Sequence, residues 1–292
     1  MEVVTTYRIL RKEVLAPTLN MFEIEAPLVT KKAKAGQFVI LRIHEEGERI
    51  PLTIADFDRE KGTITCVFQE VGKTTKELGA LGEGDFIKDF VGPLGLPSHI
   101  EKYGRIACVG GGVGVAPVHP IARALKEAGN EVTGIIGART KELLFWEDKM
   151  RAACSELRVI TDDGSYARKG FVTDLLKEVI EEKGDIALCL AIGPLPMMRA
   201  VCGLTKQYNL KTFVSLNSIM VDGTGMCGCC RVSVGGETRF ACVDGPEFDG
   251  HQVDFDEMAR RSVIYKPKEQ TALERYNSQG AHKCSCNCGG DS

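Results

Sequence analysis

Residues 105–117 read RIACVGGGVGVAP, an apolar strand that runs into a glycine-rich loop and then into a predicted helix over residues 116–128. Glycines let the backbone approach a pyrophosphate, and the N-terminus of a helix adds N–H donors and a favourable dipole. A tight strand–helix turn uses the same glycines, but the strand before the loop and the helix after it favour nucleotide binding. The residues expected to bind a nucleotide here are Gly110, Gly111, Gly112, Gly114, Ala116 and Pro117.

The hydrophobic pattern before and after this stretch divides the chain into domains of different fold class. Further apolar strands are predicted at 132–136, 158–161 and 186–192, with helical stretches between them, which indicates an α/β doubly wound parallel sheet over residues 100–216. Residues 1–99 carry short apolar segments such as 37–43 and 63–68, separated by charged or glycine-bearing turns. That spacing is typical of a small antiparallel β-barrel.

A second glycine-rich loop, VDGTGMCGCC at residues 221–230, has the composition of an iron–sulfur site. Cys227 and Cys230 form C-x₂-C, Asp222 stands where the first cysteine of a plant-type [2Fe–2S] loop would lie, and Cys242 follows downstream. We therefore expect Asp222, Cys227, Cys230 and Cys242 to bind a [2Fe–2S] cluster. Two alternatives remain open: a zinc site completed by Cys229 or a tail cysteine, and a simple Asp-Gly turn at Asp222.

Length, charge and cysteine content limit the other possibilities. A chain of 292 residues suggests two domains, and a net charge of −3 argues against a nucleic-acid partner. The longest apolar run, residues 186–192, is too short to cross a bilayer, and no export signal opens the sequence. Twelve cysteines then indicate a reducing cytoplasm. After the cluster loop subdomain at 217–265 we expect a polar tail at 266–292, where the metal role of Cys284, Cys286 and Cys288 stays open.

A barrel, a GGGxGxAP loop and a C-terminal [2Fe–2S] loop together resemble the ferredoxin–NADP reductase superfamily over residues 1–265. Within it, the chain resembles the electron-transfer subunits of dihydroorotate dehydrogenase. It also resembles the small (alpha) subunits of NADH-dependent reduced ferredoxin:NADP oxidoreductase, which are sulfide dehydrogenase-like. The first group uses four cysteines at the cluster, whereas the second has aspartate at the position of Asp222. Asp222 therefore favours the second group.

The resemblance implies an FAD site in the barrel. Residues 49–54, RIPLTI, vary the superfamily's Arg-x-aromatic-Ser motif, with Thr53 expected to donate to the flavin N5 region as the catalytic residue and Arg49 expected to reach the pyrophosphate. Residues 71–78, VGKTTKEL, resemble the helix start that holds the FAD phosphates. The expected FAD-binding residues are Arg49, Pro51, Leu52, Thr53, Gly72, Lys73, Thr74 and Thr75.

The resemblance also places residues of the second domain around NAD. Segments 161–165 and 193–198 match those that surround the nucleotide in the superfamily. The second strand ends at Arg139 rather than at the acidic residue that usually binds the adenosine ribose, so these residues do not decide between NAD and NADP. The residues expected to contact the nucleotide are Arg139, Asp162, Asp163, Gly193, Pro194 and Met197.

The function implied is that of an electron-transfer flavoprotein subunit. It would exchange hydride between NAD(H) and FAD, and single electrons between FAD and the cluster. The resemblance places it in an electron-bifurcating heterodimer with a larger flavin and iron–sulfur subunit, through which ferredoxin and NADP(H) would react. Two alternatives are the electron-transfer subunit of dihydroorotate dehydrogenase, and a redox-sensing or scaffold subunit that binds nucleotide without turnover.

Overall fold

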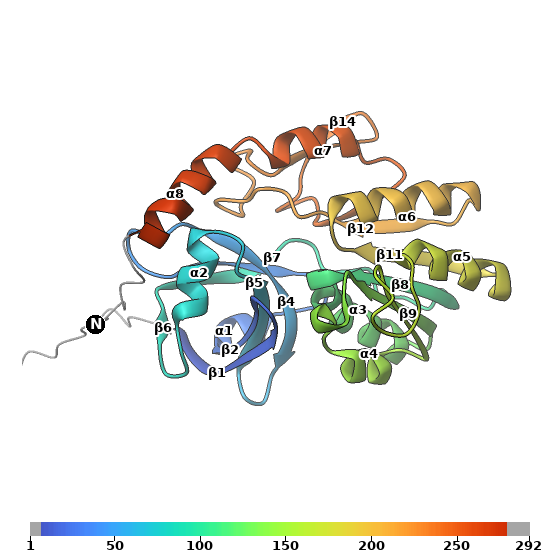
Figure 1. Cartoon of the computed structure of the whole chain (residues 1–292), viewed down its shortest axis with the longest axis horizontal. Coiled ribbons are helices and arrows are strands. Elements are labelled where there is room, and N and C mark those ends of the chain that lie inside the picture. The colour runs from blue at the N-terminus through green and yellow to red at the C-terminus, as the bar shows by residue number, and fades with distance from the viewer. Residues whose placement is uncertain (1–6, 279–292) are drawn as a thin grey trace, which may run out of the picture.

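The computed structural model describes residues 7–278, and its first part is a nearly closed antiparallel barrel (Figure 1). The sheet runs β6-β1-β2-β5-β4-β3-β7, and its two edge strands are joined by a single residue, Lys88. The elements of this domain are β1 (Tyr7–Ala16), β2 (Leu19–Glu25), α1 (Pro27–Thr30), β3 (Phe38–Arg42), β4 (Ile50–Asp58), β5 (Thr63–Gln69), α2 (Lys73–Ala80), β6 (Phe86–Ile87) and β7 (Asp89–Leu94).

The second part is the expected doubly wound sheet, in the order β10-β9-β8-β11-β12-β15. All neighbours pair in parallel except β12 and β15, which pair antiparallel. The elements are β8 (Arg105–Gly111), η1 (Gly112–Gly114), α3 (Val115–Glu127), β9 (Glu131–Ala138), η2 (Lys141–Leu143), α4 (Glu147–Ala153), β10 (Glu156–Thr161), α5 (Val172–Lys183), β11 (Ile186–Ile192), α6 (Leu195–Gln207), β12 (Thr212–Ser215) and β15 (Glu247–Asp249). Both fold predictions are confirmed.

The segment after β12 lacks a large sheet of its own. It contains the hairpin β13 (Arg231–Val234) and β14 (Glu237–Phe240), lends β15 to the neighbouring sheet, and ends in α7 (Phe255–Ser262) and α8 (Lys266–Ser278). The sequence predicted a polar tail from residue 266, whereas the structure places an exposed helix against α2, with Lys76 Nζ 3.5 Å from Asn277 Oδ1. Lysine, glutamate, alanine and leucine all favour helix there. The predicted tail cysteines lie outside the described residues.

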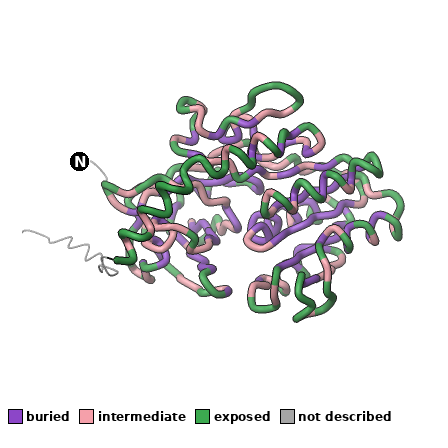
Figure 2. The backbone as a smooth tube through the Cα atoms, turned by 45° about the horizontal axis from the view of Figure 1, so that its top comes forward, coloured by how far each residue is buried: buried purple, intermediate pink, exposed green. Residues whose placement is uncertain are grey.

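Residues along the strands of both sheets are largely buried (Figure 2), and α3 is mostly buried as well, whereas α8 has no buried residue. One hydrophobic cluster joins the two domains, because Leu19, Ala55 and Val67 of the barrel pack with Val118 and Ala122 of α3. Another joins the C-terminal segment to the parallel sheet and to β3. Across residues 7–278, no helix combines the length and apolarity that a membrane span requires.

Candidate functional site

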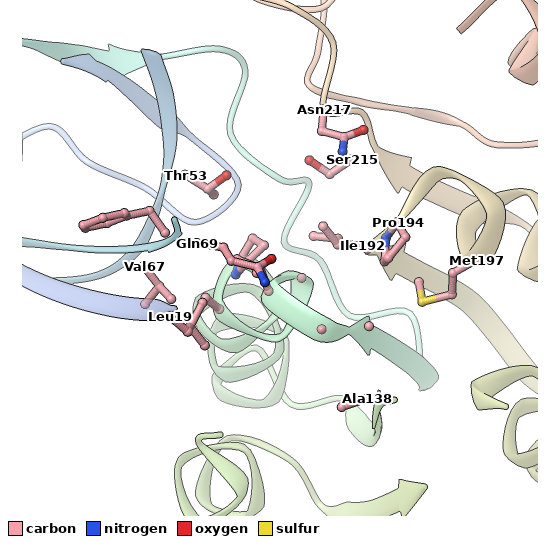
Figure 3. Close-up of a pocket in the computed structure, with 18 of the residues that line it drawn as sticks. Leu19, Thr53, Val67, Gln69, Ala138, Ile192, Pro194, Met197, Ser215 and Asn217 are labelled. Carbon is pink, nitrogen blue, oxygen red and sulfur yellow. The ribbon is translucent and has the colours of Figure 1, made fainter. Parts of the chain in front are cut away.

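A cavity of about 1010 Å³ lies between the barrel and the parallel sheet. Figure 3 shows Leu19, Thr53 and Gln69 on the barrel side, facing Ile192, Ser215 and Asn217 across the opening. The cavity runs along the carboxyl ends of the parallel strands, where nucleotides bind in doubly wound sheets. Of the predicted cofactor-binding residues, those that line it are Pro51, Leu52, Thr53, Thr75, Gly111, Gly112, Gly114, Ala116, Pro117, Arg139, Asp162, Gly193, Pro194 and Met197.

The glycine-rich loop forms one wall of the cavity, and its glycines approach neighbouring atoms too closely to carry a side chain. A Cβ at Gly114 would lie 2.1 Å from the carbonyl oxygen of Ile192, and one at Gly111 would lie 2.2 Å from Met197 Sδ. Gly112 has φ +53°, which favours glycine. Helix α3 starts directly after the loop, and Gly114 and Ala116 at its start line the cavity. The Val115 amide already bonds to the Gly112 carbonyl and Pro117 has no N–H, so the helix start favours a phosphate mainly through its dipole. The loop fits a pyrophosphate.

The barrel wall is built by β4, which carries Thr53 two residues before a bulge. Thr53 pairs with Phe38 of β3, and both residues line the cavity. Between Ile54 and Asp56 the pairing with β5 shifts by one residue, so Ala55 is the bulged residue. Arg49 is exposed just before β4 and is not among the residues that line the cavity, so its predicted contact with a pyrophosphate stays a prediction.

The predicted helix start at Gly72 is the N-cap of α2, but its hydroxyl groups already have partners. Thr75 Oγ1 accepts hydrogen bonds from the amides of Val71 and Gly72, both at 3.0 Å, and donates to the Gly72 carbonyl at 3.1 Å. Thr74 is buried and donates its hydroxyl to Glu48, while Lys73 pairs with Glu77. The donors left for an FAD phosphate are therefore the backbone amides of the first turn. Gly110, buried beneath its loop, contributes only backbone.

Arg139 and Asp162 stand side by side at the ends of β9 and β10. The amide of Asp162 donates to the Ala138 carbonyl at 3.0 Å, and partial burial raises the pKa of the Asp162 carboxyl while Arg139 opposes that rise. The side chain of Asp163 points elsewhere: its carboxylate accepts from the amide and hydroxyl of Ser165, which lowers its pKa. The structure thus brings Asp162, but not Asp163, to the cavity.

Several lining residues were not predicted from the sequence. Gln69 ends β5, and Phe171 stands exposed at the start of α5. Ser215 ends β12, and Asn217 and Ser218 follow it. The last three lie at the carboxyl end of a strand that the sequence analysis did not identify. Polar residues after an apolar TFV stretch at 212–214 were the available signal, and this stretch is too short to stand out from a loop.

The cluster loop brings two of its predicted ligands together and leaves the other two at the surface. Cys230 and Cys242 are buried with their Sγ atoms 3.2 Å apart, whereas Cys227 is exposed. The Asp222 carboxylate accepts from the amides of Thr224 at 2.9 Å and Cys227 at 2.8 Å, and these bonds lower its pKa. Burial, with the neighbouring Cys230, raises the pKa of the Cys242 thiol to about 12, so iron must displace its proton.

The donor set suits iron and sulfide better than a compact single-ion site. Among residues 7–278, no group of three histidine, cysteine, aspartate or glutamate side chains is gathered closely enough to hold one metal ion. Gly223, Gly225 and Gly228 have positive φ, a conformation that favours glycine. Because glycine has no Cβ, the backbone amides at these positions stay uncovered and can approach the sulfides of a cluster. Three thiols and a carboxylate on such a loop fit a [2Fe–2S] cluster.

Two protein-family models match this chain, one over the cluster loop and one over the nucleotide-binding domain. The iron–sulfur cluster binding domain of dihydroorotate dehydrogenase B matches residues 217–254. The oxidoreductase NAD-binding domain matches residues 108–203. The first match decides between iron–sulfur and zinc, and the second confirms the nucleotide-binding role of this domain.

Individual relatives cover nearly the whole chain. The dihydroorotate dehydrogenase B electron transfer subunit homolog of Thermotoga maritima is 49% identical over 92% of this chain and 94% of its own. The uncharacterized protein in adh 3'region of Clostridium beijerinckii is 51% identical over 96% and 98%. A solved chain of an NADH-dependent reduced ferredoxin-NADP oxidoreductase is 47% identical, with TM-score 0.89 over 95% of this chain and 100% of that one. The chain therefore belongs to the family of dihydroorotate dehydrogenase B electron-transfer subunits and their homologues, and it is an NAD(H)-dependent flavin and iron–sulfur oxidoreductase subunit.

Proposed function

We propose that this chain is the small subunit of an electron-bifurcating NADH-dependent reduced ferredoxin:NADP oxidoreductase. When bound, FAD would exchange a hydride with NAD(H) and pass single electrons to the [2Fe–2S] cluster. Thr53 would donate its hydroxyl toward the flavin from β4, and the amides at the start of α2 would hold the FAD phosphates. The glycine loop before α3 would hold the NAD pyrophosphate, and Asp162 would bind the adenosine ribose.

The observation that carries this proposal is the short connection between the cavity and the cluster loop. Phe38 lines the cavity, and Ile40, two residues along the same strand, lies on the same face. A Cβ at Gly223 would lie 2.7 Å from both Ile40 Cδ1 and Leu94 Cδ1, so the cluster loop rests directly on β3 and β7. One strand of the barrel thus touches the flavin side and the cluster side.

The cluster loop also supplies a surface for a partner. Met226 is 88% exposed beside the exposed Cys227, and Val221 and Val243 are 40% and 38% exposed nearby in the same segment. Apolar side chains around a redox centre suit docking of a second protein, because contact brings the two centres close. We infer that the larger flavin and iron–sulfur subunit docks here, and that ferredoxin and NADP(H) react on that partner. The twelve cysteines support a reducing cytoplasm.

A second candidate function is electron transfer to dihydroorotate dehydrogenase, because relatives named for that activity share 34% identity over 77% of this chain. Asp222 separates the two: the resemblance to the ferredoxin-linked subunits includes an aspartate at this position. Purification of the native complex tests the choice. A partner that oxidises NADPH while reducing ferredoxin supports the proposal, whereas a partner that oxidises dihydroorotate supports the alternative.

The experiment that tests the electron path is an anaerobic visible spectrum of the purified chain before and after NADH. We expect flavin bands and broad iron–sulfur absorption, both of which bleach on addition. A flavin that stays oxidised would contradict the path and favour a subunit that binds nucleotide without turnover.

A further inference from the structure

Two polar contacts outside the cavity join α3 of the nucleotide domain to β4 of the barrel. We propose that Arg123 and His119 of α3, bound to Asp56 and Ala55 of β4, are positioning residues that set the nicotinamide against the flavin. This inference rests on the proposed function, since it assumes that hydride passes between the two domains. The four residues are called the α3–β4 latch below.

The first contact is an ion pair between the domains. Arg123 donates through a terminal guanidinium nitrogen to Asp56 Oδ1 at 2.8 Å, and both side chains are partly buried. The same Asp56 oxygen accepts from the amide of Phe57 at 2.9 Å, which fixes the carboxylate in place. An ion pair whose acceptor is already held by backbone loses less side-chain freedom than an ordinary surface pair.

The second contact uses the bulge in β4. Because Ala55 is the extra residue in the pairing with β5, its carbonyl is released from the ladder and lies 3.4 Å from His119 Nδ1. His119 is buried and stacks edge-on against Trp146, with ring centroids 5.4 Å apart. Burial lowers the pKa of His119, so the ring is neutral near pH 7 and can keep its proton on Nδ1 for Ala55.

Each side of the latch belongs to an element that also carries part of the cofactor site: α3 begins at the glycine loop, and β4 carries Thr53. His119 and Arg123 are four residues apart and so share one face of α3, the helix whose N-terminus faces the nucleotide. Asp56 follows Thr53 by three residues on β4. Because α3 packs along β4 (Figure 1), a shift at the latch moves the glycine loop relative to Thr53. A displacement of about 1 Å between reacting groups can cost on the order of 100-fold in rate.

A buried apolar interface, which includes Ala55 itself, should hold the two domains together even when the polar contacts of the latch are removed. Ala55, Val118 and Ala122 belong to one buried cluster that spans both domains. Apolar contact is not directional, whereas an ion pair and a carbonyl hydrogen bond are. The latch therefore acts on orientation more than on cohesion.

The test is a double-mutant cycle with Arg123→Gln and Asp56→Asn in the full chain, singly and together. Anaerobic stopped-flow reduction of bound FAD at increasing NADH separates the limiting rate from the Kd. We expect each single variant to lower the limiting rate about tenfold, the double variant to fall no further, and the Kd for NADH to change less than about twofold. Arg123→Lys should recover part of the rate, and His119→Phe, which keeps the ring against Trp146, should lower it about threefold.

Arg151→Gln is the matched control, because Arg151 pairs with Glu147 at 2.7 Å within α4 of the same domain. Limiting rates within twofold of this control would overturn the proposal, as would additive effects of the two latch variants. Hydrogen exchange at 54–58 and 115–123 is a second readout, and we expect faster exchange in the latch variants only. If NADH reduces no flavin even in the unmodified chain, the proposed function fails, and unchanged exchange would separately overturn the latch.

Discussion

The hydride half and the cluster half of this molecule are built in different ways. The cavity lies between two regular sheets that share a buried apolar cluster. Its glycine loop is tightly packed, since a Cβ added at Gly114 would lie 2.1 Å from the carbonyl oxygen of Ile192. The cluster half has one short hairpin, β13–β14, and its loop at 221–230 carries glycines with positive φ; two of the four expected ligands lie at the surface. One half is shaped by packing, and the other depends on the group that it binds.

This difference follows from the ligands. A dinucleotide makes many weak contacts, which act only if the protein holds them in place beforehand. An iron–sulfur cluster forms a few strong bonds to thiolates and draws the loop around itself. We therefore expect the cavity to keep its shape when a cofactor is absent and the cluster loop to lose much of its order when the iron is removed.

The largest effect that separates the halves should come from Cys230→Ser. Cys230 is buried beside Cys242, so its loss removes a ligand from the interior of the loop. We expect iron content and the broad iron–sulfur absorption to be lost, while NADH still reduces the flavin. Cys229→Ser changes the adjacent, partly exposed thiol and should keep the cluster. Cluster loss in Cys229→Ser with retention in Cys230→Ser would contradict the ligand assignment.

In the cavity half, a substitution at a closely packed glycine should lower the free energy of unfolding. In Gly114→Ala the new methyl would lie 2.1 Å from the Ile192 carbonyl oxygen and 2.8 Å from Gly193 Cα, both of which are backbone. We expect a loss of roughly 3 kcal/mol or more in the free energy of unfolding. Gly203→Ala in α6 meets nothing within 4 Å and should stabilise by about 0.5–1 kcal/mol. Denaturant melts of the two variants check this, and equal stabilities would contradict it.

Site residues that lie in one short motif could be predicted from the sequence, whereas those that reach the site through strand pairing could not. The glycine loop and the cluster loop were found because each carries most of its functional residues in one short stretch, 110–117 and 222–230, with only Cys242 further along the chain. Ser215 and Asn217 were missed because they enter the cavity only through the pairing of β12 with β11, over three residue pairs. Asp163 was grouped with Asp162, since no local pattern shows that Ser165 holds its carboxylate. The bulge at Ala55 likewise depends on its partner strand.

Within the cavity half, Asp162 should determine the preference between NAD(H) and NADP(H). With Asp162 beside Arg139, a 2′-phosphate would meet a carboxylate, while the ribose hydroxyls of NADH would find an acceptor. Asp162→Asn should weaken NAD⁺ binding and strengthen NADP⁺ binding, each about tenfold, in equilibrium titrations of the oxidised protein with the oxidised nucleotides. Asp163→Asn is the control, because that side chain bonds to Ser165, and it should leave both affinities within twofold. An unchanged preference in Asp162→Asn would exclude Asp162 as the ribose ligand.

The smallest expected effect lies at Glu247, where the two halves are joined. This carboxyl on β15 accepts from Ser98 Oγ in the link after the barrel, and burial raises its pKa above the usual value of 4.5. The folded state therefore binds more protons than the unfolded chain above pH 4.5, so this group's contribution lowers stability as pH rises through that window.

Glu247→Gln keeps an acceptor for Ser98 and removes the titration, so its melting temperature relative to the unmodified chain should rise between pH 5 and pH 8 by a few degrees, roughly. Glu237→Gln, an exposed change on β14, should show no such trend. A pH-independent difference for Glu247→Gln would mean that the carboxyl is ionised in the folded state, and that Ser98 and nearby His99 offset its burial.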